Sequence, residues 1–454
     1  MIFERFKSKI VAHFSYFIGS NTEALVIDPR RDCHVYLNKA QLENMNIKYV
    51  FETHRNEDYV VGSLELAQLT GAEIYHGPWP DFKYGNKLKD GQEFYVGKLK
   101  VTAIHTPGHT PGCMSYAVAD LASGEEAVLV CTGDALFVND VGRTDFGGLV
   151  KRREWSENLY DSIFNKMFSL GDHVILCPAH GSGSVCGGNI ADREWSTLGL
   201  ERRMNPLLQL SKEQFVEHKI NEHQEYAPYF RLMEKYNVEG APFIGAGPKP
   251  IALSPKAFQD CMDKGGNIID IRTPIAFNNV HIKGSFNFPR ERLSKVGWII
   301  PNNNPLLLIV NTKDDLAYTA ISLARLGFDN IIGYLGKGLS SWLKAGNPKE
   351  SSGSLSVHEL KEKIVDGEKL ILLDVRTQDE WDKGRIADSK RIYVGLLEKR
   401  IQEVPTRSPV VIICKSGNRS SLAASILLRD GRKNISNLLG GITAWQNAGY
   451  KIVK

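Results

Sequence analysis

The sequence lacks a cysteine pattern of the kind that supports a disulfide-stabilised or zinc-ribbon protein. Its seven cysteines are scattered along 454 residues, and no two of them form a CxxC pair. An odd, dispersed set argues against a disulfide framework and for a reducing compartment. The missing CxxC pairs argue against a cysteine zinc site.

The sequence also lacks a long apolar run and a charge block. No segment approaches the roughly 18 uncharged apolar residues that a transmembrane helix needs. The first residues, MIFERFKSKIVAHF, interleave charges with apolar side chains, unlike a signal peptide. The net charge of +4 is small and Lys and Arg do not cluster, so nucleic acid is not an expected partner. We therefore expect a soluble, cytoplasmic protein without a membrane segment.

The length fits about three domains of ordinary size. Two Gly-, Pro- or Ser-rich stretches, Gly240–Pro250 and Lys344–Ser356, are typical of linkers. They predict domains at residues 1–245, 246–350 and 351–454.

The second and third predicted domains are copies of one another. Trp342 and Trp445, Gly346 and Gly449, and Asn311 and Cys414 are separated by the same interval, and IIDIRTP matches LLDVRTQ upstream. A constant interval across unrelated residue types indicates an internal repeat. Short apolar strands alternate with helical stretches in each copy, which predicts a small α/β domain with a mainly parallel sheet.

In the first predicted domain, four apolar runs end at His or Asp residues. The segments are ETHRNEDY at 52–59, HTPGHTPG at 105–112, TGDALFVNDVGRTDF at 132–146 and CPAHGSGS at 177–184. Polar residues at strand ends are where α/β folds place their chemistry. In this order the segments resemble the motif series of the metallo-β-lactamase superfamily, and within it most closely the persulfide dioxygenases. Glyoxalase II hydrolases are the nearest other relatives. The resemblance implies an αββα sandwich.

One motif departs from the superfamily pattern THxHxDH. Asn56 and Tyr59 stand where its second and third histidines belong. A two-metal hydrolase needs these ligands to hold paired ions, so their loss argues against that chemistry. The residues that hold the single iron of the dioxygenases are retained as His54, His109 and Asp134. Two histidines and one carboxylate leave open positions on Fe(II) for O₂ and substrate, and the resemblance thus implies one Fe(II) per chain, with zinc as an alternative occupant after purification.

Five further residues are expected around this site. Asp58 and His180 remain from the second metal position, and we expect them to orient the ligands by hydrogen bonds rather than to face solvent. Arg143 and Asp145 match family residues that support the site; they either meet an anionic thiol substrate or form a structural ion pair. Cys186 resembles a cysteine near the metal in bacterial dioxygenase–rhodanese fusions, where it either carries a persulfide or is an inert buried thiol.

The last domain contains the loop CKSGNR between an apolar strand, Val410–Ile413, and a helix. Backbone N–H groups of such a loop and the helix dipole favour the thiolate form of Cys414. Gly417 permits the tight turn, Lys415 adds positive charge, and Arg419 can position an anionic sulfur donor. The sequence also predicts Ser420 or Ser421 as the helix cap. The loop resembles that of the rhodanese sulfurtransferases, in which the cysteine cycles through a persulfide.

The first copy lacks this chemistry. Asn311 replaces the nucleophile and Leu316 replaces the arginine, while Asp314 and Asp315 would repel an anionic donor. We therefore expect a degenerate rhodanese domain that acts as a spacer or docking unit.

These resemblances together imply an enzyme that oxidises a low-molecular-weight persulfide, of the glutathione or coenzyme A type, with O₂ to sulfite and thiol. Cys414 would then transfer sulfur between persulfide and sulfite or thiosulfate. We also expect a homo-oligomer. The alternatives are a sulfurtransferase with a metal-free scaffold, a thioester hydrolase related to glyoxalase II, and a non-enzymatic sulfur carrier.

Overall fold

The computed structural model describes residues 1–454, which form two compact units. The first unit comprises Met1–Tyr226, Phe230–Gly247 and Ala324–Gly327, and the second comprises the remaining residues. No helix in the structure is both long and apolar enough to cross a lipid bilayer.

The first unit is built on two six-stranded sheets. The first sheet contains, in spatial order, β1 (Ile2–Ser8), β2 (His13–Ser20), β3 (Glu23–Ile27), β4 (Asn46–Phe51), β5 (Glu73–His76) and β6 (Asn86–Lys87). The second contains β14 (Ser196–Thr197), β13 (Ile175–Pro178), β10 (Ala127–Gly133), β9 (Met114–Asp120), β8 (Leu99–His105) and β7 (Glu93–Val96). A separate hairpin joins β11 (Leu136–Phe137) to β12 (Asp140–Val141).

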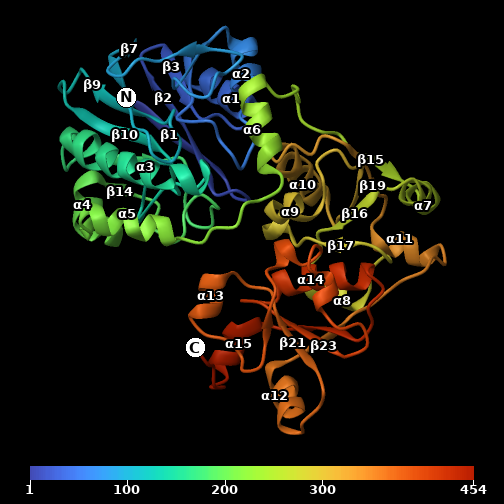
Figure 1. Cartoon of the computed structure of the whole chain (residues 1–454). Coiled ribbons are helices and arrows are strands. Elements are labelled where there is room, and N and C mark those ends of the chain that lie inside the picture. The colour runs from blue at the N-terminus through green and yellow to red at the C-terminus, as the bar shows by residue number, and fades with distance from the viewer. The chain divides into compact units, whose positions relative to one another are not determined.

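Helices cover the outer faces of both sheets, so the layers run helix, sheet, sheet, helix. The helices are α1 (His34–Leu42), α2 (Ser63–Thr70), α3 (Gly148–Asp161), α4 (Leu198–Met204), α5 (Lys212–Asn221) and α6 (Phe230–Glu239), with the short turns η1 (Ser162–Met167), η2 (Phe168–Leu170) and η3 (Pro206–Gln209). Figure 1 shows α1 and α2 on one side of the sandwich and α3 to α5 on the other.

The alternation along β2 explains this layering. Every residue of β2 is buried. Tyr16 and Ile18 belong to the core between the sheets, whereas Phe17 packs with Tyr36 of α1 on the opposite face. Successive side chains of a strand point to opposite faces, and a strand with apolar residues on both is covered on both.

The second unit contains two five-stranded sheets of the same topology. The first has the order β15 (Ile251–Leu253), β19 (Ile331–Leu335), β18 (Leu306–Ile309), β16 (Asn267–Asp270) and β17 (Phe286–Asn287). The second has the order β20 (Gly353–Leu355), β24 (Ile435–Leu438), β23 (Val410–Ile413), β21 (Ile371–Asp374) and β22 (Lys390–Arg391). All strand pairs in both sheets are parallel.

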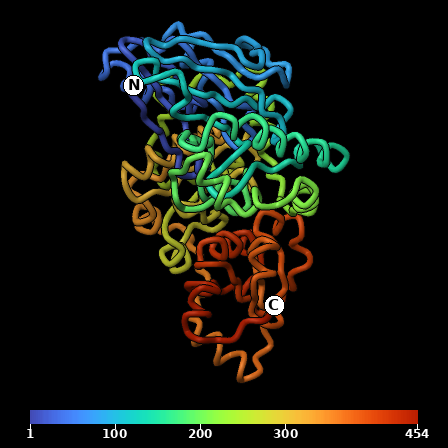
Figure 2. Tube along the Cα trace, turned by 90° about the vertical axis from the view of Figure 1, so that its left-hand side faces the viewer, coloured from blue at the N-terminus to red at the C-terminus, as the bar shows by residue number.

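Helices connect the strands of each copy, which Figure 2 traces from yellow to red. The first copy has α7 (Pro255–Asp263), α8 (Pro274–Asn279), η4 (Arg290–Lys295), α9 (Val296–Ile299), α10 (Lys313–Arg325) and α11 (Leu339–Lys344). The second has α12 (Val357–Val365), α13 (Gln378–Asp382), η5 (Val394–Leu396), η6 (Ile401–Glu403), α14 (Asn418–Arg429) and α15 (Gly441–Asn447). The predicted fold class, a metallo-β-lactamase sandwich followed by two parallel α/β domains, is confirmed.

Polar contacts join the two copies around helix α14. Ser421 Oγ lies 2.5 Å from Asn287 Oδ1, and Asn287 N donates to Ser425 Oγ over 3.2 Å. Asn287 Nδ2 also donates to the carbonyls of Asp270 and Arg272. The helix that follows Cys414 is therefore held in part by the first copy.

Candidate metal centre and sulfur-transfer loop

Four chemically active side chains of the first unit stand at or just beyond strand ends. His54 follows β4, His109 follows β8, Asp134 follows β10 and His180 follows β13. Each of the four is at most 1% exposed. The structure thus brings together the three residues that sequence analysis predicts as iron ligands.

The ligand atoms of this set converge. Asp134 Oδ2 lies 3.7 Å from His54 Nε2 and 3.6 Å from His109 Nε2. None of these three buried atoms has a hydrogen-bond partner. Buried polar atoms in proteins are almost always paired, so a cluster of unpaired donor atoms facing one point is what a metal site requires.

The other nitrogen of each histidine is fixed by a hydrogen bond. The Thr53 hydroxyl donates to Asp28 Oδ2 over 2.7 Å, so at 2.8 Å it accepts from His54 Nδ1–H. His109 Nδ1 lies 2.9 Å from the Arg143 carbonyl, which only accepts, and therefore also carries a proton. In the neutral form of each ring, Nε2 then carries a lone pair for a metal ion.

Electrostatics separate the roles of these groups. Burial lowers the pKa of His54 to about 4, so its ring is neutral near pH 7. Burial opposes the charge of Asp134, but His180 and His54 outweigh it and hold the pKa of Asp134 below its ordinary range. A neutral imidazole and an ionised carboxylate are the forms in which these side chains bind metals.

Glu57 joins this cluster, and sequence analysis missed it. The His54, Glu57 and His109 ligand atoms lie within 4.8 Å of one another. Glu57 Oε2 is buried and without a hydrogen bond. Its position within THRNEDY was visible, but the superfamily pattern assigns no ligand there, so the motif alone gave no reason to choose it.

His180 and Cys186 lie next to Asp134, and the ligand atoms of His109, Asp134 and Cys186 lie within 4.8 Å of one another. His180 Nδ1 contacts Asp134 Oδ1 at 2.7 Å, and His180 Nε2 lies 3.3 Å from Asp58 Oδ1. Asp58, His180 and Cys186 form a second group of ligand atoms within 4.8 Å of one another. Burial raises the pKa of the Cys186 thiol well above its ordinary value, so Cys186 is a protonated thiol in this environment.

Arg143 and Asp145 form a two-armed ion pair. Arg143 Nε and one terminal nitrogen contact the two Asp145 oxygens at 2.6 and 2.7 Å. The other terminal nitrogen of Arg143 donates to the carbonyl of Val185. With Arg143 1% exposed, the geometry favours the structural ion pair over contact with substrate.

The donor set fits one transition-metal ion. Its imidazole nitrogens and carboxylate oxygens are hard to borderline ligands, which suit Fe(II), Zn(II) or Mn(II). At the two altered superfamily positions, Asn56 Nδ2 donates to the His54 carbonyl and Tyr59 packs on His13 with ring centroids 3.9 Å apart.

In the last domain, Cys414 lies at the end of β23 and is 1% exposed. Gly417, at φ 98°, turns the loop so that its N–H donates to Cys414 Sγ over 3.1 Å. The predicted cap by Ser420 or Ser421 is wrong, because α14 already begins at Asn418 with Gly417 as its N-cap. Ser420 Oγ instead contacts Cys414 Sγ at 3.3 Å.

Arg419 is paired rather than open. Its terminal nitrogens lie 2.5 and 2.6 Å from the two carboxylate oxygens of Glu380. Lys415 is exposed. This is compatible with its predicted role, which is only to add positive charge near the loop. Any anionic donor that uses Arg419 must therefore share it with Glu380.

The corresponding loop of the first copy carries different side chains. Asn311 and Asp314 are exposed, and Asp315 pairs with Arg290 at 2.9 Å. No thiol and no arginine occupy the positions that Cys414 and Arg419 hold in the second copy.

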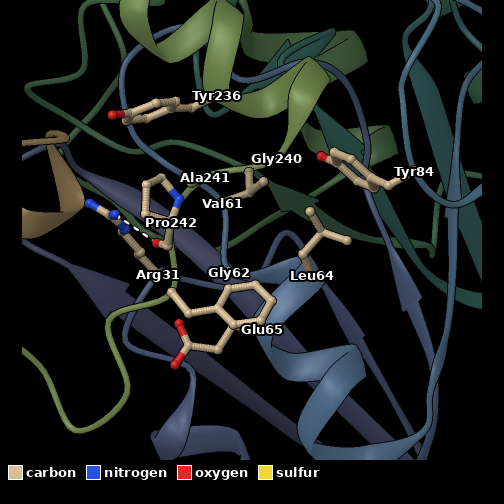
Figure 3. A pocket seen from close by; sticks show the side chains of 11 residues that line it. Arg31, Val61, Gly62, Leu64, Glu65, Tyr84, Tyr236, Gly240, Ala241 and Pro242 are labelled. Carbon is tan, nitrogen blue, oxygen red and sulfur yellow. Dashed lines mark hydrogen bonds between the residues drawn. The ribbon is translucent and has the colours of Figure 1, made fainter.

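Two cavities of the first unit differ in their relation to the metal cluster. The pocket in Figure 3, beside Arg31, Glu65 and Tyr84, has a volume of about 10 Å³, space for about one water. A second cavity of about 140 Å³ is lined by His180 and Phe14, among others. Only the second borders a residue of the candidate site.

Comparison with known families agrees with these two sites. Residues 9–180 match the metallo-beta-lactamase superfamily, and residues 254–345 and 356–448 each match the rhodanese-like domain. The chain is therefore a metallo-beta-lactamase domain followed by two rhodanese-like domains.

Individual relatives also match the first domain. Mitochondrial persulfide dioxygenase ETHE1 of Bos taurus is 29% identical over 211 residues, which is 45% of this chain and 74% of the relative. The Homo sapiens protein gives the same identity and shares. Hydroxyacylglutathione hydrolase GloC of Haemophilus influenzae is 27% identical over 207 residues, 41% of this chain and 87% of the relative. The first domain is thus similar to ETHE1 persulfide dioxygenases and, at nearly the same identity, to a hydroxyacylglutathione hydrolase.

A solved structure covers more of the chain. A metallo-beta-lactamase from Staphylococcus aureus subsp. aureus COL aligns with a TM-score of 0.66 and 26% identity, over 74% of this chain and 98% of that one. The fold of most of this chain is therefore also found in another protein.

Proposed function

We propose that this chain is an iron-dependent persulfide dioxygenase with a rhodanese sulfurtransferase at its C-terminus. The observation that carries the first activity is the convergence of three buried, unpaired ligand atoms, on His54, His109 and Asp134. Homology to ETHE1 persulfide dioxygenases supports the choice of substrate class.

The overall reaction would convert a persulfide, O₂ and water into a thiol, sulfite and two protons. Fe(II) bound by His54, His109 and Asp134 would supply the redox chemistry with O₂. The protein's own part is positioning: Thr53 fixes the ring of His54, the Arg143 carbonyl fixes the ring of His109, and His180 holds Asp134. Such outer hydrogen bonds orient ligands and tune a metal site.

The second activity is assigned to Cys414. Its thiolate would take the outer sulfur of thiosulfate, forming a cysteine persulfide and releasing sulfite, or run in reverse. The Gly417 N–H donates to Cys414 Sγ over 3.1 Å and supports an anion there, whereas the Ser420 hydroxyl donates to Asn437 Oδ1. The first copy has no such group, and we assign it no transfer chemistry.

One alternative has structural support. Asp58, His180 and Cys186 could hold a second ion, which a hydrolase related to the glyoxalase II-type relative would use. Metal analysis separates these functions, since a dioxygenase needs one iron per chain, a hydrolase two zinc ions, and a pure sulfurtransferase none.

The test uses the full chain, purified without oxygen. We expect about one iron per chain and O₂ uptake with glutathione persulfide, both lost in His109→Ala and Asp134→Ala. The matched control is Cys414→Ser, which should keep both. Normal O₂ uptake in either ligand variant would refute the site assignment.

Three further features remain proposals of the same kind. They are the domain division at residues 1–245, 246–350 and 351–454, a cytoplasmic location, and homo-oligomerisation.

A further inference from the structure

Glu57 has one carboxylate oxygen with a partner and one without. Glu57 Oε1 accepts from the Arg55 guanidinium over 3.0 Å. Glu57 Oε2 is buried, has no hydrogen bond, and lies 3.4 Å from His109 Nε2 and 3.9 Å from His54 Nε2. The unpaired oxygen therefore faces the same point as the unpaired nitrogens of the two histidines.

A chain of contacts holds Glu57 in this orientation. The Arg55 nitrogen that binds Glu57 also binds Glu234 of α6 over 2.9 Å. The hydroxyl of Tyr226 donates to the same Glu234 oxygen over 2.9 Å. Because Arg55 is anchored on both sides, it fixes Oε1 and leaves Oε2 directed at the histidines.

The distances from the two histidines to the two carboxylates fit a metal site. The four separations between a histidine Nε2 and an oxygen of Glu57 or Asp134 span 3.4 to 3.9 Å. Metal bonds of about 2.0–2.2 Å place neighbouring donors about 3–3.6 Å apart. The donor atoms here are slightly farther apart than this, so they would need to move only a few tenths of an ångström closer to bind an ion.

The negative charge of Glu57 also suits a divalent metal ion at this position. A buried dication with one carboxylate and two neutral imidazoles keeps a net positive charge, which is unfavourable away from water. A second carboxylate cancels that charge. Glu57 supplies it from within the cluster.

We propose that Glu57 is a fourth protein ligand, so that the metal ion is bound by His54, Glu57, His109 and Asp134. This inference rests on the metal centre of the proposed function. A six-coordinate ion would then keep two open positions instead of three. Two are enough for one persulfide sulfur and one O₂.

The test measures metal binding without persulfide or O₂. The full chain is stripped with a chelator and titrated with Co(II), reading the dissociation constant by competition and the coordination from the visible absorption of Co(II). We compare the wild-type chain with Glu57→Gln and Glu57→Asp. The control is Glu65→Gln, which removes a buried carboxylate that binds only backbone N–H groups of Ile244 and Gly245.

If Glu57 is a ligand, Glu57→Gln weakens Co(II) binding by at least about tenfold and changes the absorption spectrum. Glu57→Asp keeps the charge but withdraws the oxygen, so it should fail to restore either property. Glu65→Gln should match the wild-type chain. An unchanged spectrum in Glu57→Gln, or full restoration by Glu57→Asp, would overturn the proposal.

The outcomes also separate the two proposals. A wild-type chain that binds no metal would end both the proposed dioxygenase and the role of Glu57. A wild-type chain that binds one ion and oxidises persulfide, with Glu57→Gln binding Co(II) equally well, would end only the role of Glu57.

Discussion

Replacing Glu380 by Gln tests the ion pair beside the sulfur-transfer loop. Glu380 accepts from both terminal nitrogens of Arg419, at 2.5 and 2.6 Å. Burial opposes the charge of Glu380, but Arg419 outweighs burial and lowers the pKa of Glu380 to about 2 from its ordinary 4.5. The folded chain therefore favours the ionised carboxylate.

The size of the effect follows from that shift. A difference of about 2.5 pKa units corresponds to about 3.4 kcal/mol of folding free energy. Because 29% of the Glu380 side chain is exposed, solvent screening reduces this to about 1–2 kcal/mol. The contribution is present above pH 4.5 and is lost as the pH falls towards 2, since the folded-state pKa is the lower one.

The assay is urea unfolding of the full chain from pH 7 to pH 3, followed by hydrogen exchange in peptides of the last domain. We expect Glu380→Gln to lower the opening free energy of this domain by about 1–2 kcal/mol at pH 7, and by a shrinking amount below pH 4.5. The control is Glu368→Gln, which breaks an exposed pair with Lys363 and should cost little. A loss that does not change with pH, or an equal loss in the control, would refute the reasoning.

Three other predictions concern different parts of the chain. Thr53→Val removes the hydroxyl between Asp28 and His54 and should weaken metal binding by about 10- to 100-fold; an unchanged dissociation constant would contradict this. Cys414→Ser should abolish thiosulfate-to-cyanide sulfur transfer, because serine offers no accessible anion near neutral pH, whereas Asn311→Ala should leave the rate unchanged. Burial raises the pKa of Glu52 to about 8, so the unfolding free energy of the wild-type chain should fall as the pH rises from 4.5 to 8. Relative to Glu52→Gln, this loss of unfolding free energy should reach up to about 4 kcal/mol. Parallel pH profiles of the two chains in urea unfolding would argue against it.

The residues of the metal cluster could be predicted because their motifs resemble those of the metallo-β-lactamase superfamily. That resemblance implied the three ligands and the αββα fold. In the structure, His54, His109 and Asp134 each stand at or just beyond the end of a strand.

Other parts of the candidate sites depend on contacts that sequence does not reveal. Arg419 of α14 pairs with Glu380 of α13, 39 positions away. Glu57 turns towards the histidines because Arg55 is anchored on α6, 179 positions from Arg55. The helix cap was mispredicted for a related reason: Ser421 is satisfied by Asn287 of the other copy rather than by its own helix. In each case a distant residue decides how a local motif is used.

The contact between Asn287 and helix α14 has a consequence for dissecting the chain. Ser421, Ser425 and Asn287 are all at most 1% exposed and satisfy one another. Cutting the chain between the copies would expose these polar groups to water, next to the helix that shapes the cysteine loop. A fragment that begins near residue 351 therefore lacks a support that the full chain gives to α14. The first copy has no nucleophile, yet it provides that support through Asn287.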